Sequence, residues 1–173
     1  MELLEAIRTR RAIRKFKPDP VPPELIEKIL EAAHWAPSSV NSQPCEFIVV
    51  TKPETRARIS RAFVLGPFIK DAPVTIVVAA DRLKSTLPLQ DGAIAAYAIW
   101  LAAHGLGLGA CWVNPTIQFA IKRILGIPFN KRLVAVMAIG YPDETPVHPR
   151  KKLSDMVYFE KHGNKQGPIN FKE

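Results

Sequence analysis

The sequence contains little that a secreted, membrane-spanning or metal-binding protein would need. Its two cysteines, Cys45 and Cys111, are far apart and show no Cys-x-x-Cys spacing, so we expect buried thiols in a reducing compartment, with a catalytic thiol as the weaker alternative. Glu2 and Glu5 interrupt the N-terminus before an apolar signal core could begin. No apolar run reaches the roughly 20 residues that span a bilayer, and the four histidines lack metal-ligand spacing. We therefore expect a cytoplasmic protein without a metal site.

What the sequence does have is positive charge. Its 173 residues are 47% hydrophobic, which suffices for the core of one domain, and the formal net charge is +8. This charge favours an anionic ligand, a nucleic acid or an acidic surface as partner. Nucleic-acid binding needs aromatic side chains interleaved with the basic ones or a helix-turn-helix, and Phe16 alone does not provide that pattern. We therefore expect no nucleic-acid partner.

The basic residues gather in two clusters, one between residues 8 and 17 and the other at Arg150-Lys151-Lys152. If the N-terminal helix marked by Leu3 continues through the first cluster, Arg10 and Arg14 share one face. Their repulsion then costs roughly a few tenths of a kcal/mol unless an anion lies between them. A phosphate would supply that anion, because the planar arginine side chain can hold two of its oxygens. The alternative is a solvated basic surface.

The stretch from Ala36 to Pro44 predicts a polar connection between a helix and a strand. Pro37 ends the helix, because it lacks an amide hydrogen and disfavours the helical conformation of the residue before it. Pro44 opens the strand, where a missing donor is tolerated. Apart from Val40, the side chains between the two prolines are hydroxyls and carboxamides. Such groups suit the edge of a polar heterocycle better than a metal or an acid. An ordinary connecting loop is the alternative.

Hydrophobic periodicity predicts alternating helices and strands. We expect Asp91 to cap one helix and Asn114-Pro115 to open another, whose free amide hydrogens would stabilise anything bound there that gains electron density. We expect residues 83–88 to form a loop. The expected strands are 45–51, 74–80, 111–113 and 132–139, and the expected helices lie near 3–7, 24–35, 52–63, 90–103 and 117–125.

The helix from Ala93 to Ala103 has no polar side, so we expect it to be buried all round. A second copy of the chain across a two-fold axis would complete that burial, and a central helix in a monomer is the alternative. The following stretch from Gly105 to Ala110 has the Gly-x-Gly-x-x-Gly/Ala spacing of dinucleotide sites. Such a site needs a strand before the glycines and a helix after them, and here that order is reversed. We therefore reject a dinucleotide site at these glycines.

Several motifs in order resemble the flavin-dependent nitroreductase family. They are Arg10-Arg11-Ala12-Ile13-Arg14-Lys15-Phe16, the loop from Ala36 to Pro44, Gln90-Asp91 with its alanine-rich helix and glycines, and Gly140-Tyr141-Pro142 with Arg150-Lys151. The resemblance covers residues 1–157. It implies an α+β fold with a mixed central sheet flanked by helices, assembled as an intertwined homodimer with two FMN molecules at the interface. Residues 158–173 form a C-terminal tail that either frays or wraps the partner subunit.

The resemblance also implies the residues that bind FMN. Arg10, Arg11 and Arg14 match the segment that reaches the phosphate, ribityl chain and pyrimidine edge, and Arg150 and Lys151 match the pair that closes on the phosphate. Pro37, Ser38, Ser39, Asn41 and Gln43 match the loop that comes from the other subunit, and Val113 and Asn114 match the backbone beside flavin N5. Ala12 stands where a serine is common, and Cys45 where a tryptophan is frequent. The chain also lacks the insertion that shapes the substrate pocket of larger members.

The mechanism implied is ping-pong. NADH or NADPH gives a hydride to FMN and leaves, and a nitroaromatic, quinone or related acceptor then takes the electrons at the same face. We nominate Arg14 as the cation near flavin N1 and O2, and we assign no catalytic residue because no side chain need act as acid or base. The alternatives are a reductive dehalogenase or a flavin-fragmenting enzyme on the same fold, a protein that only stores flavin, and a basic nucleic-acid-binding protein.

Overall fold

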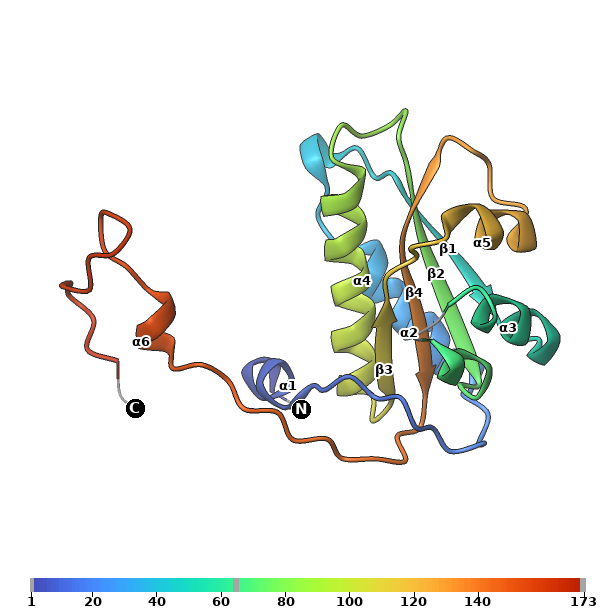
Figure 1. Ribbon diagram of the computed structural model, residues 1–173, viewed down its shortest axis with the longest axis horizontal. Coiled ribbons are helices and arrows are strands. Elements are labelled where there is room, and N and C mark those ends of the chain that lie inside the picture. Colours follow the sequence, from blue (N-terminus) through green and yellow to red (C-terminus); the bar gives the residue numbers. More distant parts are fainter. Residues whose placement is uncertain (1, 64–65, 172–173) are drawn as a thin grey trace.

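The computed structural model describes residues 2–63 and 66–171, which build a four-stranded sheet with helices on both faces (Figure 1). The strand order is β1-β2-β4-β3, and neighbouring strands run antiparallel. The strands are β1 (Cys45–Val50), β2 (Val74–Asp81), β3 (Gly109–Val113) and β4 (Lys131–Gly140). The N-terminal segment joins the sheet through a parallel bridge between Ala12 and Ala110, so the sheet combines both kinds of pairing.

The central strand β2 is buried along its whole length because both of its faces are covered. Ile76 and Val78 pack in one core cluster, whereas Val77 and Ala79 pack in the other, as the period-two alternation of a strand requires. The continuous apolar run at 74–80 therefore predicted a strand covered on both sides correctly.

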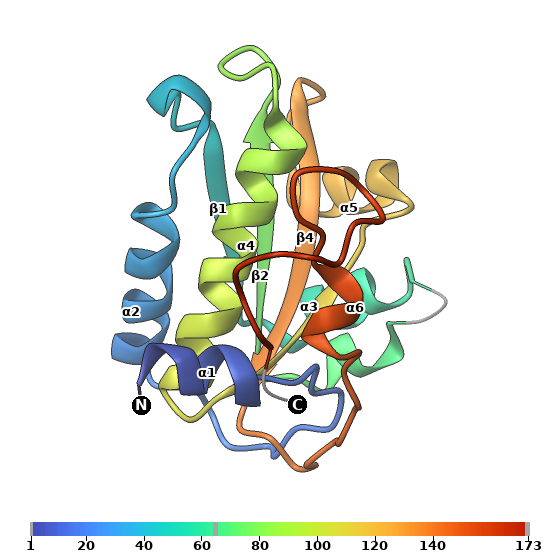
Figure 2. The ribbon, with the colours of Figure 1, turned by 90° about the vertical axis from the view of Figure 1, so that its left-hand side faces the viewer.

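The helices form one layer on each face of the sheet (Figure 2). The helices α2 (Pro23–His34) and α4 (Pro88–Gly105) cover one face. The other face is covered by α3 (Pro53–Ser60), the 3-10 helix η2 (Pro67–Lys70) and α5 (Gln118–Leu125). The short helix α1 (Leu3–Thr9) packs beside α4. These helices and the four strands confirm the predicted order of elements.

Three local expectations about helix ends are wrong. The helix α4 begins at Pro88 with Leu87 at its N-cap, so Asp91 lies within the helix rather than capping it. The helix α5 begins at Gln118, so Asn114-Pro115 does not open it. The helix α1 ends at Thr9 because the next residues pair with β3, and the amide of Ile13 donates to the carbonyl of Ala110 at 3.1 Å. Arg10 and Arg14 therefore do not share a helical face.

Apolar side chains remain exposed on the outer side of α1 and α4. Leu3 and Leu4 are each 64% exposed, and Ile94 and Tyr97 on α4 are 42% and 41% exposed. The expectation that this helix is buried all round is therefore wrong for a single chain. Burial of these side chains by a second copy of the chain stays a prediction.

The C-terminal segment leaves the body of the molecule after β4 and carries α6 (Leu153–Met156) at a distance from the sheet (Figure 1). Its far end is folded on itself. Lys165 Nζ donates to the carbonyl of Val157 at 3.1 Å, and the ring of Phe159 lies so close to Gly167 that a Cβ there would collide with it. These contacts lie within the tail itself, and whether it frays or docks on a partner stays a prediction.

Candidate functional site

The first predicted site residue, Arg10, is held between α1 and α4. Its guanidinium lies over the ring of Trp100, with Cζ 4.0 Å from the ring centroid. The Nε and Nη1 atoms are buried and have no hydrogen-bond partner within residues 2–63 and 66–171. Buried polar groups are nearly always paired, so these donors point to a ligand that supplies the acceptors.

The charges around Arg10 point to an anion. Burial lowers the pKa of Arg10, and repulsion from Arg150 and Arg11 lowers it further, whereas Tyr97 acts in the opposite direction. The two basic clusters, far apart in sequence, thus lie close enough for their charges to interact. Like charges gathered at a partly desolvated position are destabilising unless an opposite charge joins them. A phosphate would both satisfy the buried donors and offset the repulsion.

Arg11 is partly used by the chain itself. Its Nη1 donates to the carbonyls of Arg8 at 2.7 Å and Arg10 at 2.9 Å, near the end of α1. These carbonyls would otherwise lack partners because a helix leaves its last carbonyls free. The Arg11 charge therefore remains beside Arg10, but this nitrogen is occupied.

Arg14 lies at a different hollow, next to the end of β3. The hollow has a volume of about 350 Å³ and is lined by Arg14, Val113 and Asn114, and by the aromatic side chains of Phe63 and Phe68. The backbone before it is fixed, because Glu144 Oε1 accepts a hydrogen bond from the amide of Lys15 at 3.1 Å and another from the amide of Arg14. Three residues predicted separately from the sequence are thus brought together at one surface.

The polar loop from Pro37 to Gln43 contains the 3-10 helix η1 (Ser39–Asn41) and an unusual backbone. Val40, Asn41 and Gln43 have positive φ values of 46°, 56° and 47°. Such conformations are strained for residues other than glycine, most of all for β-branched Val40, and they persist only where surrounding contacts hold them. The positive φ angles show a tightly turned backbone that depends on the contacts around it.

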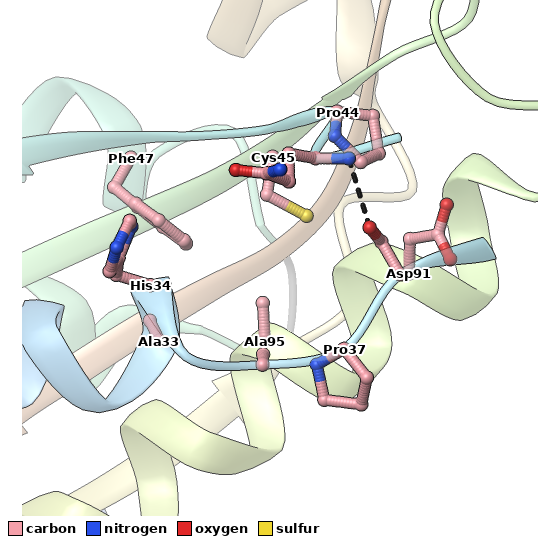
Figure 3. A pocket seen from close by; sticks show the side chains of 11 residues that line it. Ala33, His34, Pro37, Pro44, Cys45, Phe47, Asp91 and Ala95 are labelled. Carbon is pink, nitrogen blue, oxygen red and sulfur yellow. Dashed lines mark hydrogen bonds between the residues drawn. The ribbon is translucent and has the colours of Figure 1, made fainter. Parts of the chain in front are cut away.

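Asp91 on α4 holds this loop from outside, and further hydrogen bonds form within the loop. Its carboxylate is 97% buried and accepts hydrogen bonds from the amide of Ser39 at 2.8 Å and the hydroxyl of Ser85 at 2.5 Å. Within the loop, Ser38 Oγ accepts from the amide of Gln43 at 2.9 Å (Figure 3). The two hydrogen bonds to the Asp91 carboxylate are charge-assisted, and such bonds are stronger than bonds between neutral groups. Asp91 therefore positions the loop instead of capping the helix.

A small hollow of about 150 Å³ lies behind the loop, between α2 and α4 (Figure 3). Cys45 lines it, and burial together with the Asp91 charge raises the pKa of this thiol to about 11. Burial also raises the pKa of Cys111. Both cysteines are free thiols, and Cys111 is buried as predicted, whereas Cys45 is only partly buried. Protonated thiols are poor nucleophiles, so the geometry does not favour a catalytic cysteine.

The loop and the basic residues lie at opposite ends of α4 (Figure 1). The loop is bound to Asp91 near the start of the helix, whereas Arg10 stacks on Trp100 and Thr9 Oγ1 contacts His104 Nε2 at 2.8 Å near its end. With a rise of about 1.5 Å per residue, Asp91 and His104 are roughly 20 Å apart along the helix. One chain therefore does not bring the complete predicted set together.

Comparison with known proteins identifies the family. The sequence profile of the Nitroreductase family matches residues 7–66 and 60–141. The chain belongs to the nitroreductase family. It is 42% identical over 168 residues to a protein of Methanothermobacter thermautotrophicus that carries the provisional name NADH dehydrogenase/NAD(P)H nitroreductase, and the match covers 93% of this chain and 88% of that protein. A solved FMN-dependent nitroreductase from Clostridium difficile is 34% identical, with 91% of this chain and 99% of that one covered and a TM-score of 0.86. The predicted family and α+β fold are confirmed.

Other relatives of this nitroreductase-family chain bear different names. A 5,6-dimethylbenzimidazole synthase of Rhodobacter capsulatus is 28% identical over 84% of this chain and 87% of that protein. An iodotyrosine deiodinase of Thermotoga neapolitana is 25% identical over 87% of this chain and 95% of that protein. Membership of the nitroreductase family therefore does not by itself select the electron acceptor.

Sequence reasoning missed two residues of the candidate site. Trp100 was included in the apolar helix without a role, although Tyr97 and Trp100 are the aromatic residues of a helix otherwise made of small and aliphatic ones, and this contrast is a usable signal. The position of Glu144, which orders the Arg14 backbone, had no signal because it depends on a contact between distant segments.

Within the described residues, no helix has the length and apolar character to cross a membrane, and no group of three or more His, Cys, Asp or Glu side chains could hold a metal.

Proposed function

We propose that this chain is an FMN-dependent NAD(P)H oxidoreductase. The observation that carries the proposal is Arg10, whose buried Nε and Nη1 have no acceptor within the described residues and whose charge is opposed by Arg11 and Arg150. The terminal phosphate of FMN would satisfy these donors and offset this repulsion. The FMN dependence of the Clostridium difficile relative and the name of the Methanothermobacter relative support this choice of cofactor and electron donor.

We assign each predicted residue a role in this site. Arg10, Arg150 and Lys151 hold the phosphate, and Arg11 adds charge beside them. Arg14, Val113 and Asn114 line one hollow, which suits the edge of the flavin ring. Ala12 contributes backbone only, because it has no hydroxyl and pairs with Ala110.

The remaining contacts come from a partner subunit. Pro37, Ser38, Ser39, Asn41 and Gln43 lie at the other end of α4 from Arg10, so we propose that this loop serves the flavin of the second copy in a homodimer. Exposed apolar side chains on α1 and α4 would be buried there, and the C-terminal segment, including residues 158–173, would wrap the partner.

When bound, FMN supplies the hydride chemistry that amino-acid side chains lack. The chain's own residues bind and orient it and leave one face of the ring open. Arg14 provides positive charge where electron density increases on reduction, which favours that change. No side chain is needed as acid or base. We propose a ping-pong order, in which NADH or NADPH leaves before a nitroaromatic or quinone enters the same open face.

The first experiment is an absorbance spectrum of the purified protein, followed by anaerobic addition of NADH or NADPH. Oxidised-flavin bands that bleach on addition of either nucleotide are expected, with parallel lines in double-reciprocal plots when donor and acceptor are varied. A colourless protein that does not take up added FMN would contradict the proposal. Flavin that is retained and never bleached by either nucleotide would indicate storage rather than turnover.

The relatives with other names define the rival reactions, reductive dehalogenation and flavin fragmentation. We favour neither, because the segment between Arg82 and Leu87 is short and offers little chain for a lid over the flavin. The test adds 3-iodotyrosine or excess reduced FMN to the same assay. Release of iodide at a rate above that of quinone reduction would identify a dehalogenase, and loss of the added flavin would identify a flavin-fragmenting enzyme. Either result would contradict the proposed acceptor class.

A further inference from the structure

A second buried arginine lies far from the site described above. Arg56, on α3, is only 9% exposed. Its Nη1 donates to the carbonyl of Lys70 at 3.0 Å and also to the carbonyl of Ala72, so this end of the guanidinium is fixed by the turn between η2 and β2. Neutral carbonyls satisfy hydrogen bonds but do not balance a charge.

The other edge of the same guanidinium has no hydrogen-bond partner among the described residues. Nε is buried without a hydrogen-bond partner, and no described residue accepts from Nη2. Nε and Nη2 form the planar edge that binds two oxygens of a phosphate or carboxylate. Arg56 also has no salt bridge to any carboxylate within residues 2–63 and 66–171. The charge is therefore buried, fixed in place and unbalanced by an ion pair.

Arg56 lines a hollow of about 410 Å³ that suits a small anionic ligand. Lys70 and the hydroxyl-bearing Thr51 lie on its polar side, and Pro18, Pro20 and Pro73 form an apolar wall. Asp71 is the acidic member of the lining and pairs with Lys70, with Nζ 3.8 Å from Oδ1. The lining therefore carries two cations and one acid, and Glu54, outside the lining, is a second negative charge that acts on Arg56.

The hollow is separate from the proposed flavin site. It lies beside the end of β1 and the start of β2, whereas Arg14 and Val113 lie at β3 on the opposite edge of the sheet. A ligand here would therefore not compete with FMN.

We propose that this hollow binds a phosphate group, either free or as a small monoester, through the Nε–Nη2 edge of Arg56 and the ammonium of Lys70. A doubly charged phosphate matches two cations better than a single carboxylate does. The proline wall would contact the organic part of an ester. The inference does not depend on the flavin chemistry.

The test is calorimetric titration of the FMN-loaded protein with inorganic phosphate, methyl phosphate and acetate at constant ionic strength. Saturable binding of phosphate, and weaker binding of acetate, is expected, with flavin absorbance unchanged throughout. Tighter binding of methyl phosphate than of phosphate would identify an ester site, and the reverse order a site for the free ion. Absence of saturable phosphate binding would overturn the proposal and leave Arg56 as a structural contact alone.

Two neighbouring substitutions should act in opposite directions. Lys70→Gln removes a cation from the exposed rim and should weaken phosphate binding by about tenfold, whereas Asp71→Asn removes the competing carboxylate and should strengthen it several-fold. Both side chains are more than half exposed, so neither change threatens the fold. Arg58→Gln is the matched control, because Arg58 is an exposed cation on the same helix outside the hollow. Equal weakening by Lys70→Gln and Arg58→Gln would mean a diffuse charge effect and would contradict the site.

The same binding signal would arise if phosphate bound at an incompletely filled flavin site. The variant Arg10→Ala distinguishes binding at that site from binding at Arg56. Titration of Arg10→Ala should give the same phosphate affinity as the parent protein, because Arg10 lies at the other site. Loss of phosphate binding in this variant would assign the signal to Arg10 and overturn the inference.

Discussion

Arg10 and Arg56 are both arginines with a buried, unpartnered Nε, but their surroundings differ. Arg10 stacks on Trp100 and has other arginines as electrostatic neighbours, and the buried Nε and Nη1 of its guanidinium have no acceptor within the described residues. Arg56 donates to two carbonyls, and the nearby charges of Asp71 and Glu54 partly offset the effect of burial, which lowers its pKa. The Nη1 atom of Arg56 therefore supports the fold, whereas no donor of the Arg10 guanidinium does so within the described residues.

The largest expected effect is on stability, and it compares how much Arg56 and Arg10 contribute to the free energy of unfolding. Replacing Arg56 with Gln should lower the free energy of unfolding by about 2–3 kcal/mol, because the carbonyls of Lys70 and Ala72 lose a charged donor in a buried position. Arg10→Gln should change it by less than about 1 kcal/mol, since no protein acceptor is lost. Urea unfolding of the flavin-free proteins measures both. Equal destabilisation would show that the two arginines do not differ in this way.

The second prediction tests the same contrast on flavin binding. Arg10→Ala should weaken FMN binding by about ten- to a hundredfold, the loss expected for charged hydrogen bonds worth about 1.5–3 kcal/mol. Arg150→Ala should act in the same direction but less, because Arg150 is exposed. Equilibrium dialysis of FMN gives the affinities, and Arg58→Gln again serves as the control for loss of one positive charge. Unchanged flavin occupancy in both variants would exclude the phosphate assignment.

A third prediction extends the comparison to the opposite end of α4. Asp91→Asn keeps the shape of the side chain but removes the charge that holds Ser39 and Ser85. The strained loop should then sample other conformations, and FMN affinity should fall by about five- to tenfold, while phosphate binding at Arg56 should not change. Ser85→Ala should reproduce part of this loss. A full effect at Asp91 with none at Ser85 would place the function of Asp91 elsewhere.

The smallest expected effect depends on pH and involves His104, which lies in the Arg10 region. Burial, Arg10 and Arg11 lower the pKa of His104 from 6.5, so the folded protein binds this proton less readily than the unfolded chain. Stability should therefore be full above about pH 6.5 and should decrease as the pH falls through that value toward the folded pKa. Bound FMN would oppose the arginine charges and should reduce the pH dependence.

Thermal unfolding between pH 7.5 and 5, with and without FMN, measures this dependence. His104→Gln should flatten the curve of the flavin-free protein. A slope that is identical in His104→Gln and the parent would assign the pH dependence to other groups.

Much of the fold was predictable from local patterns. The run at 74–80 is apolar throughout because both faces of β2 are covered, and the glycines after α4 include Gly107 with φ of +80°, which allows the chain to turn back into β3. The helix ends were less predictable. Asp91 has the residue type of an N-cap, but its carboxylate satisfies the loop amide of Ser39, a contact 52 positions away in sequence.

The candidate site was predictable as a set of residue types but not as an arrangement. Arg10 and Arg14 could be nominated because paired arginines recognise a phosphate, whereas Arg150 and Asn114 were assigned to FMN through the resemblance to the family. The stacking of Arg10 on Trp100 and the support of Arg14 by Glu144 could not, because neither local spacing nor composition specifies a contact between distant segments.

The sequence by itself determined the strands, the helices, the two basic clusters and the polar loop, because periodicity, proline placement and side-chain chemistry act over a few residues. Only the tertiary structure decided which arginines are buried and which of them donate hydrogen bonds to the protein. It also placed the loop and the basic residues at opposite ends of one helix. These features depend on packing between segments far apart in the chain, where burial makes an unpaired charge costly and a correctly placed acceptor valuable.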